Sequence, residues 1–145
     1  MSSVAKRELI SLGTSLRILV TAEESQNGFS MVEMVMPAGF LGAPVHYHEL
    51  LSETFYVIEG TLRVTRDAET FDLRAGDVAV IPAGARHSLR NVSDAPVRVL
   101  EVANPGGHDR FFSELIEWME REPQWPPQDR QKLIDFGLRH DTYYE

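Results

Sequence analysis

Short apolar segments separated by turn residues fill the chain from Ser15 to Asn104, and none keeps the spacing of an amphipathic helix for long. The breaks, which include Gly60, Gly76 and the turn at Pro82–Gly84, recur roughly every 8 to 12 residues. This pattern predicts an all-β body over about residues 15–104, a sandwich or a small barrel. The expected strands are Leu16–Thr21, Phe29–Met36, Thr54–Ile58, Leu62–Arg66, Thr70–Leu73, Val78–Ile81, Arg86–Asn91 and Pro96–Val102.

The pattern becomes helical after Pro105-Gly106-Gly107. Asp109 is expected to cap a first helix that Pro123 ends, and Pro126-Pro127 to begin a second helix that Gly137 ends. These helices form an extension over about residues 108–139 that flanks the β body. Apolar residues of the extension, including two tryptophans, are expected to pack it: Phe112, Leu115, Ile116, Met119, Trp118, Trp125, Leu133, Ile134 and Phe136.

Composition narrows the possible chemistry. A chain of 145 residues with 43% hydrophobic content suits one domain, residues 1–145. Because cysteine is absent, a metal site must be built from His, Asp, Glu and water. A net charge of −8 with 14 Lys and Arg argues against a nucleic-acid partner. Neither a signal peptide nor a run of 18 apolar residues is visible, so the expectation is a cytoplasmic protein that does not span a membrane.

Three of the five histidines lie in two segments with the spacing of metal ligands. His46 and His48 stand two apart, so an extended strand turns both imidazoles to the same face. Glu53 follows at an odd offset, which requires the chain to bend so that Glu53 begins the next strand facing inward, together with Phe55. His87 comes after the turn at Pro82–Gly84 and would arrive from a further strand.

We call His46, His48, Glu53 and His87 the ligand set. Three imidazoles and one carboxylate suit a divalent ion such as Fe, Mn, Ni or Zn. Glu53 could act as a ligand, as a catalytic base, or as both. The other two histidines, His108 and His140, are isolated in the sequence, so they are expected to be structural or solvent-exposed and receive no role.

Two motifs carry a resemblance to the cupin superfamily. His46-x-His48, four residues, Glu53, six residues and Gly60 is similar to the first cupin motif. Gly76, five residues, Pro82-x-Gly84, two residues, His87, three residues and Asn91 is similar to the second at every defining position. Where the first motif usually has glycine, six residues before His46, this chain has Phe40, and either Gly39 or Gly42 could serve the turn.

The resemblance implies a double-stranded β-helix barrel, or jelly roll, with the ligand set holding a metal ion in its mouth. Tyr47 and Phe55, which lie next to ligands, are candidate pocket residues. The segment after Pro105 further resembles the C-terminal extension of small bacterial cupins, some of which are quercetinase-like. A dioxygenase-type oxidoreductase acting on a small oxygen-rich or aromatic molecule is therefore the favoured function.

Two alternatives stay open at this point. The metal could serve as a Lewis acid in non-redox chemistry, as in an isomerase, lyase or decarboxylase, or the domain could only bind a small ligand. A homodimer is also expected, because the outward apolar residues Tyr56 and Ile58 would suit a symmetric contact.

Overall fold

A computed structural model describes residues 8–11, 13–122, 124 and 127–145 of the chain. Three residues named in the sequence-based expectations, Pro123, Trp125 and Pro126, lie outside this described part. The packing of Trp125 therefore stays a prediction. The first helix ends at Arg121, before Pro123, as expected, whereas the second begins at Arg130, so the expected start at Pro126-Pro127 is wrong.

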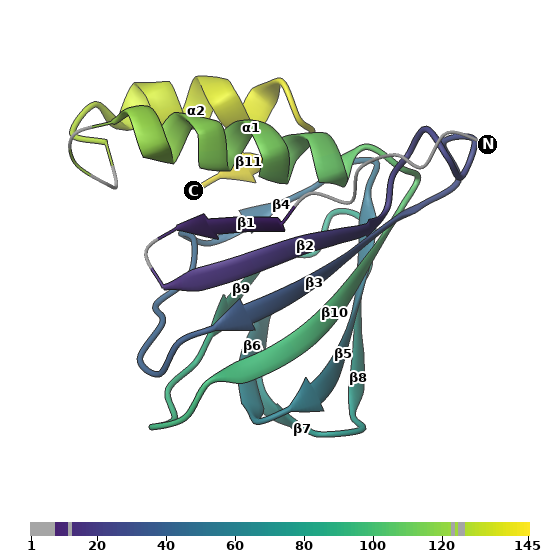
Figure 1. Ribbon diagram of the computed structural model, residues 1–145, viewed down its shortest axis with the longest axis vertical. Helices are drawn as coiled ribbons and strands as arrows, with labels where there is room; N and C mark the ends of the chain where they lie inside the picture. The colour runs from purple at the N-terminus through teal and green to yellow at the C-terminus, as the bar shows by residue number, and fades with distance from the viewer. Residues whose placement is uncertain (1–7, 12, 123, 125–126) are drawn as a thin grey trace.

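Two antiparallel sheets form the body of the molecule (Figure 1). The six-stranded sheet has the order β1-β2-β3-β10-β5-β8, and the five-stranded sheet has the order β11-β4-β9-β6-β7. The strands are β1 (Glu8–Ser11), β2 (Thr14–Val20), β3 (Ser30–Met36), β4 (His46–Tyr47), β5 (Ser52–Glu59), β6 (Thr61–Arg66), β7 (Glu69–Arg74), β8 (Val78–Ile81), β9 (His87–Arg90), β10 (Val97–Asn104) and β11 (Tyr143–Tyr144). This jelly-roll arrangement confirms the predicted fold class.

Burial alternates along the central strands, as expected when one face of each sheet covers a shared core. Glu53, Phe55 and Val57 of β5 are buried, whereas Tyr56 and Ile58 are exposed, so the predicted inward parity of this strand is confirmed. The core contains residues of both sheets, among them Val32, Phe55, Val57, Leu62, Val64, Val97 and Val99.

The exposed side of β5 continues onto β8, the edge strand beside it. Tyr56 pairs with Val78 across the two strands, and Val78 and Val80 are exposed as well. Such an apolar outer surface is compatible with the expected homodimer, which stays a prediction.

All eight expected strands are present, with ends that shift by no more than two residues. Two strands lie outside the expected limits of 15–104. β1 pairs with β2 at one edge of the larger sheet, and β11, near the C-terminus, pairs with β4. Both are short strands at the edges of sheets, where alternation over a few residues gives little signal.

The helices lie side by side across one end of the strands, with β11 and the C-terminus next to them (Figure 1). They are α1 (His108–Arg121) and α2 (Arg130–Leu138). Gly107, not the expected Asp109, occupies the N-cap of α1, and the carboxylate of Asp109 accepts a hydrogen bond from the Ala22 N–H instead. Asp129 caps α2 by accepting from the Gln131 N–H. No helix in the described ranges is long and apolar enough to cross a membrane.

Gly137 lies inside α2 and does not end it. A glycine is needed at this position because the C-terminal segment runs close over it. A Cβ atom there would lie 2.4 Å from the Thr142 carbonyl oxygen and 2.9 Å from the ring of Tyr144. The absence of a side chain at Gly137 therefore lets the chain return toward β4.

Both candidate glycines near Phe40 adopt positive φ, 76° at Gly39 and 75° at Gly42. Gly42 has the stricter requirement, because an added Cβ atom would lie 2.0 Å from the Leu89 carbonyl oxygen. The loop before His46 thus passes against β9 where only glycine fits.

Candidate metal centre

The fold brings all four members of the ligand set together. His46 in β4 pairs directly with His87 in β9, His48 follows β4, and Glu53 lies near the start of β5 in the other sheet. Each residue offers a nitrogen or oxygen atom, and these atoms all lie within 4.8 Å of one another. His48, Glu53 and His87 are buried, whereas His46 is half-buried.

The chain crosses from one sheet to the other between His48 and Glu53, which is the bend that the odd spacing requires. Asp141 holds this crossing from the far end of the chain. Its carboxylate accepts hydrogen bonds from the backbone N–H groups of Glu49, Leu50 and Leu51, at 2.9, 3.0 and 2.9 Å. The C-terminal segment therefore fixes the loop that positions two ligands.

Each imidazole of the ligand set is also oriented from behind by a backbone carbonyl group. The Nδ1 atoms lie 2.8 to 2.9 Å from the carbonyl oxygens of Pro44 for His46, Asp141 for His48 and Ala85 for His87. A carbonyl oxygen only accepts, so each Nδ1 donates to it, and Nε2 is the ring nitrogen that remains available to a ligand. This arrangement is typical of histidines that bind metal ions.

Glu53 joins the imidazoles through a single oxygen. Its Oε1 lies 2.9 Å from His48 Nε2 and 3.0 Å from His87 Nε2. Burial raises the pKa of Glu53, but the hydrogen bonds from His48 and His87 outweigh it and hold this pKa well below its usual range. The carboxylate is therefore an anion, which is the form that binds a cation.

The imidazoles differ in their affinity for protons. Burial, reinforced by the nearby His87, lowers the pKa of His46 to about 4, so this ring is neutral at physiological pH. Burial also opposes protonation of His48, but its hydrogen bond to Glu53 prevails and raises its pKa. A bound cation would compete with this proton for His48 Nε2.

His108, expected to have no role, lies beside the ligand set. It is buried at the start of α1, its ring centroid is 5.2 Å from that of His48, and its Nε2 lies 3.7 Å from Glu53 Oε2. Oε2 of Glu101, a residue of β10, lies 3.6 Å from the same His108 Nε2. We call Glu53, Glu101 and His108 the inner triad.

A sequence signal for Glu101 exists, because it interrupts the inward row Val97, Val99, Ala103 with a carboxylate. His108 has no comparable signal. His140 matches its expectation, since it forms an ion pair with Glu114 at 2.7 Å, away from the ligand set.

The two candidate pocket residues lie in different surroundings. Phe55 is buried in the core on the same face of β5 as Glu53. Tyr47 stacks on Tyr143 with ring centroids 5.0 Å apart, and the Arg86 guanidinium lies over its ring. Its neighbours in the sequence, His46 and His48, point to the opposite face of β4, so these contacts place Tyr47 beside β11.

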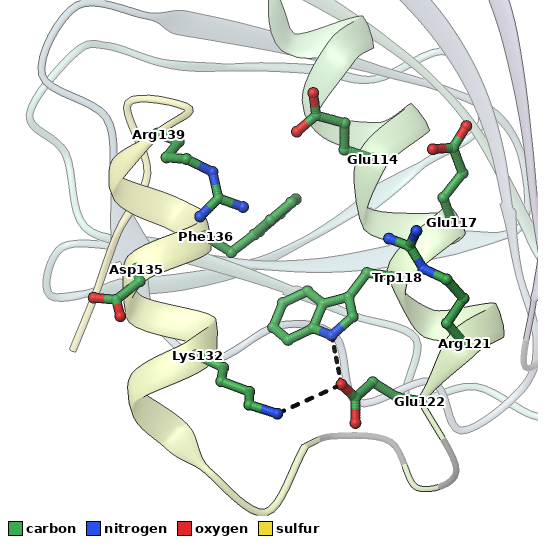
Figure 2. A pocket seen from close by; sticks show the side chains of 9 residues that line it. All are labelled: Glu114, Glu117, Trp118, Arg121, Glu122, Lys132, Asp135, Phe136 and Arg139. Carbon is green, nitrogen blue, oxygen red and sulfur yellow. Dashed lines mark hydrogen bonds and ion pairs between the residues drawn. The ribbon is translucent and has the colours of Figure 1, made fainter.

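A surface groove lies between the two helices, apart from the ligand set (Figure 2). Trp118 and Phe136 form its floor, and side chains of both charges surround them. The Trp118 indole N–H donates to Glu122 at 2.9 Å, and Lys132 lies 3.9 Å from the same carboxylate. These contacts join α1 to α2, which gives the groove a structural explanation.

The jelly roll and the clustered imidazoles define a class of small β-barrel proteins with a candidate metal site. The model of the family described as "Cupin domain" matches residues 32–103. The chain belongs to the cupin superfamily.

Two curated relatives are similar over part of their length. The chain is 37% identical over 95 residues to "Polyketide synthase CurC" of Streptomyces cyaneus, covering 64% of this chain and 60% of that protein. It is 33% identical over 104 residues to quercetin 2,3-dioxygenase of Bacillus subtilis, covering 71% of this chain and 30% of that protein. The matches thus span less than two thirds of either relative.

Among solved structures, a sugar phosphate isomerase from a cupin superfamily of Silicibacter pomeroyi superposes with a TM-score of 0.58. It is 26% identical, and the match covers 68% of this chain and 71% of that chain.

Proposed function

We propose that this chain is a metal-dependent cupin enzyme of the dioxygenase type, acting on a small oxygen-rich or aromatic molecule. One divalent ion would be held by the ligand set: His46, His48, Glu53 and His87. The observation that carries the proposal is that all three imidazoles have Nδ1 against a backbone carbonyl oxygen, while Nε2 of His48 and Nε2 of His87 both contact Glu53 Oε1. Similarity to quercetin 2,3-dioxygenase supports the choice of chemistry.

The donor set fits such an ion. The separations of 2.9 and 3.0 Å between Glu53 Oε1 and the two nitrogens are close to the distance between neighbouring ligands on an ion with bonds of about 2.1 Å. When bound, the ion would supply a redox-active or Lewis-acidic centre for an oxygen-bearing substrate. Half-buried His46 leaves one side of the group accessible to that substrate.

The chain's own residues divide the remaining tasks. Glu53 acts first as a ligand, because a carboxylate whose pKa is held this low has little tendency to take a proton from a substrate hydroxyl. A catalytic role for Glu53 requires that one of its contacts with His48 and His87 be broken first. Phe55 lies deeper on the same face and would exclude water from the base of the site.

Non-redox chemistry, as in an isomerase, is the second candidate, and the similarity to the sugar phosphate isomerase structure favours it. Oxygen distinguishes the two. Protein loaded with Fe²⁺, Mn²⁺ or Ni²⁺ is mixed with a flavonol or a catechol, and oxygen uptake is measured beside substrate loss.

We expect turnover that stops without oxygen and falls to background in His87→Ala. His140→Gln, a histidine substitution away from the ligand set, is the matched control and should keep its metal and activity. Turnover of a sugar phosphate or other substrate that persists without oxygen would contradict the dioxygenase proposal in favour of the second candidate.

A further inference from the structure

The inner triad is a second group of potential metal ligands that shares Glu53 with the first. Its members come from β5, β10 and the first turn of α1, and their ligand atoms lie within 4.8 Å of one another. All three side chains are buried, with 3%, 0% and 5% exposure for Glu53, Glu101 and His108. The triad therefore links the ligand set to α1.

Within the described part of the chain, no group donates a hydrogen bond to Glu101. Both of its carboxylate oxygens are buried without a partner among the described residues, which is unusual for a charged residue type in a protein interior. A residue that destabilises the fold in this way calls for a compensating interaction, and a cation would supply it.

The spacing within the triad suits a cation better than hydrogen bonds. His108 Nε2 lies 3.7 Å from Glu53 Oε2 and 3.6 Å from Glu101 Oε2, both beyond hydrogen-bond distance. Atoms bound to one ion at about 2.0–2.2 Å lie about 3 to 3.8 Å apart when their bonds diverge by 90° to 120°. The observed distances fall within this interval.

Glu53 faces both groups with different oxygens. Oε1 contacts His48 and His87, whereas Oε2 faces His108. A bridging carboxylate between two ions needs this division of its two oxygens.

We propose that Glu53, Glu101 and His108 form a second divalent-cation site, in which Glu53 bridges to the ion held by the ligand set. The inference rests on the proposed function, because the first ion occupies the other oxygen of Glu53. Two carboxylate oxygens and one imidazole nitrogen suit Mn²⁺, Fe²⁺ or Zn²⁺. A pair of ions on opposite oxygens of one carboxylate would lie within the separation of about 3.5–4 Å found in two-metal sites.

The test titrates chelator-treated protein with Mn²⁺, and in parallel with Zn²⁺, and measures bound metal per chain together with the Mn²⁺ EPR spectrum. Wild type should bind two ions, with a spectrum broadened by coupling between them. Glu101→Gln, which keeps the size of the side chain, should bind one ion with the six-line signal of isolated Mn²⁺. His108→Phe, which keeps the ring stacked on Phe111, should do the same.

Asp109→Asn is the matched control, because Asp109 is a buried acid next to His108 but outside the triad. It should still bind two ions. Thermal unfolding of each variant checks that the fold is retained. The number of ions bound per wild-type chain tests the second site even if a variant fails to fold.

Three results are decisive. Two coupled ions in wild type and one in Glu101→Gln support the second site. One ion in wild type that survives Glu101→Gln but is lost in His87→Ala overturns the second site and leaves the proposed function standing. No bound ion in wild type overturns both.

Discussion

The ligand set and the inner triad form one buried polar group, and its two sides differ in how fully their side chains are hydrogen-bonded. On the side of the five-stranded sheet, His46, His48 and His87 each have Nδ1 against a backbone carbonyl oxygen. On the side of α1, both oxygens of Glu101 lack a hydrogen-bond donor among the described residues. Glu53 lies between the two sides and touches both.

The contacts on one side orient the imidazoles, whereas the buried carboxyl group on the other side lowers the stability of the fold. Backbone carbonyl groups fix the imidazoles before any ion arrives, so the ligand set is preorganised. The inner triad instead keeps a buried carboxyl group without a donor, which lowers the free energy of unfolding until something binds it. The first side is built to hold a ligand in place, and the second gains most from binding one.

The largest effect is expected on the oriented side. His87→Ala removes a directly contacting imidazole, and we expect divalent-ion affinity to fall by at least about 100-fold, more than loss of an outer contact causes. Isothermal titration with Zn²⁺ measures the change, with His140→Gln as the control. An affinity within about threefold of wild type would remove His87 from the ligand set.

Acid should destabilise the metal-free protein next most strongly. Burial lowers the pKa values of His46 and His108 to about 4 and about 3, below the unfolded value of 6.5, so only the unfolded chain takes up these protons as the pH falls. Glu101 has the opposite effect, because burial raises its pKa and keeps one proton on the folded chain above pH 4.5, where the unfolded chain has lost it. The pKa of His48 is raised above 6.5, so this residue changes the free energy of unfolding mainly above pH 6.5.

The net uptake is about one proton on unfolding, so the free energy of unfolding should fall by about 1.4 kcal/mol per pH unit from about pH 6.5 to 4.5. Urea unfolding at several pH values measures the slope. In Glu101→Met the slope should become steeper. A flat profile in both proteins would contradict the assigned burial of these groups.

Replacing Glu101 should stabilise the protein at neutral pH. Glu101→Met fills the same space without a buried carboxyl group, and we expect the free energy of unfolding of metal-free protein at pH 7 to rise by about 1–3 kcal/mol. Asp109→Met is the comparison, because Asp109 accepts a hydrogen bond from Ala22 and its loss should destabilise. Destabilisation by Glu101→Met would mean that Glu101 has a stabilising partner.

The smallest effect concerns the support behind His48. Asp141→Ala removes the acceptor for three N–H groups between His48 and Glu53, and we expect a loss of about 1 kcal/mol in stability and about tenfold in metal affinity. Asp141→Asn keeps one acceptor oxygen and tolerates the positive φ of 53°, so it should lie between wild type and Asp141→Ala. Equal affinity in all three proteins would show that this crossing does not position the ligands.

The sequence predicted one side of this comparison far better than the other. Spacing and parity placed His46 and His48 on one face and turned Glu53 and Phe55 inward, because strand geometry has a fixed period of two. Glu101 and His108 join Glu53 across long stretches of chain, and local periodicity carries no information about such contacts. Asp141 orients His48 through its backbone carbonyl group, which leaves no side-chain signal at all.

The helix ends show the same limit on a smaller scale. Aspartate is a residue type that commonly caps helices, but the carboxylate of Asp109 accepts a hydrogen bond from Ala22, and Gly107 is the N-cap instead. Glycine is a residue type that commonly ends helices, but close packing against Thr142 and Tyr144 explains the glycine at position 137. In both cases, a contact outside the helix outweighs the local preference.

Anomalous diffraction from crystals of the protein loaded with Mn²⁺ or Ni²⁺ tests the central claim most directly. We expect a peak within about 2.0–2.3 Å of the Nε2 atoms of His46, His48 and His87 and of Glu53 Oε1. A fully loaded crystal with no peak among these four atoms, or with a peak only elsewhere on the chain, would contradict it.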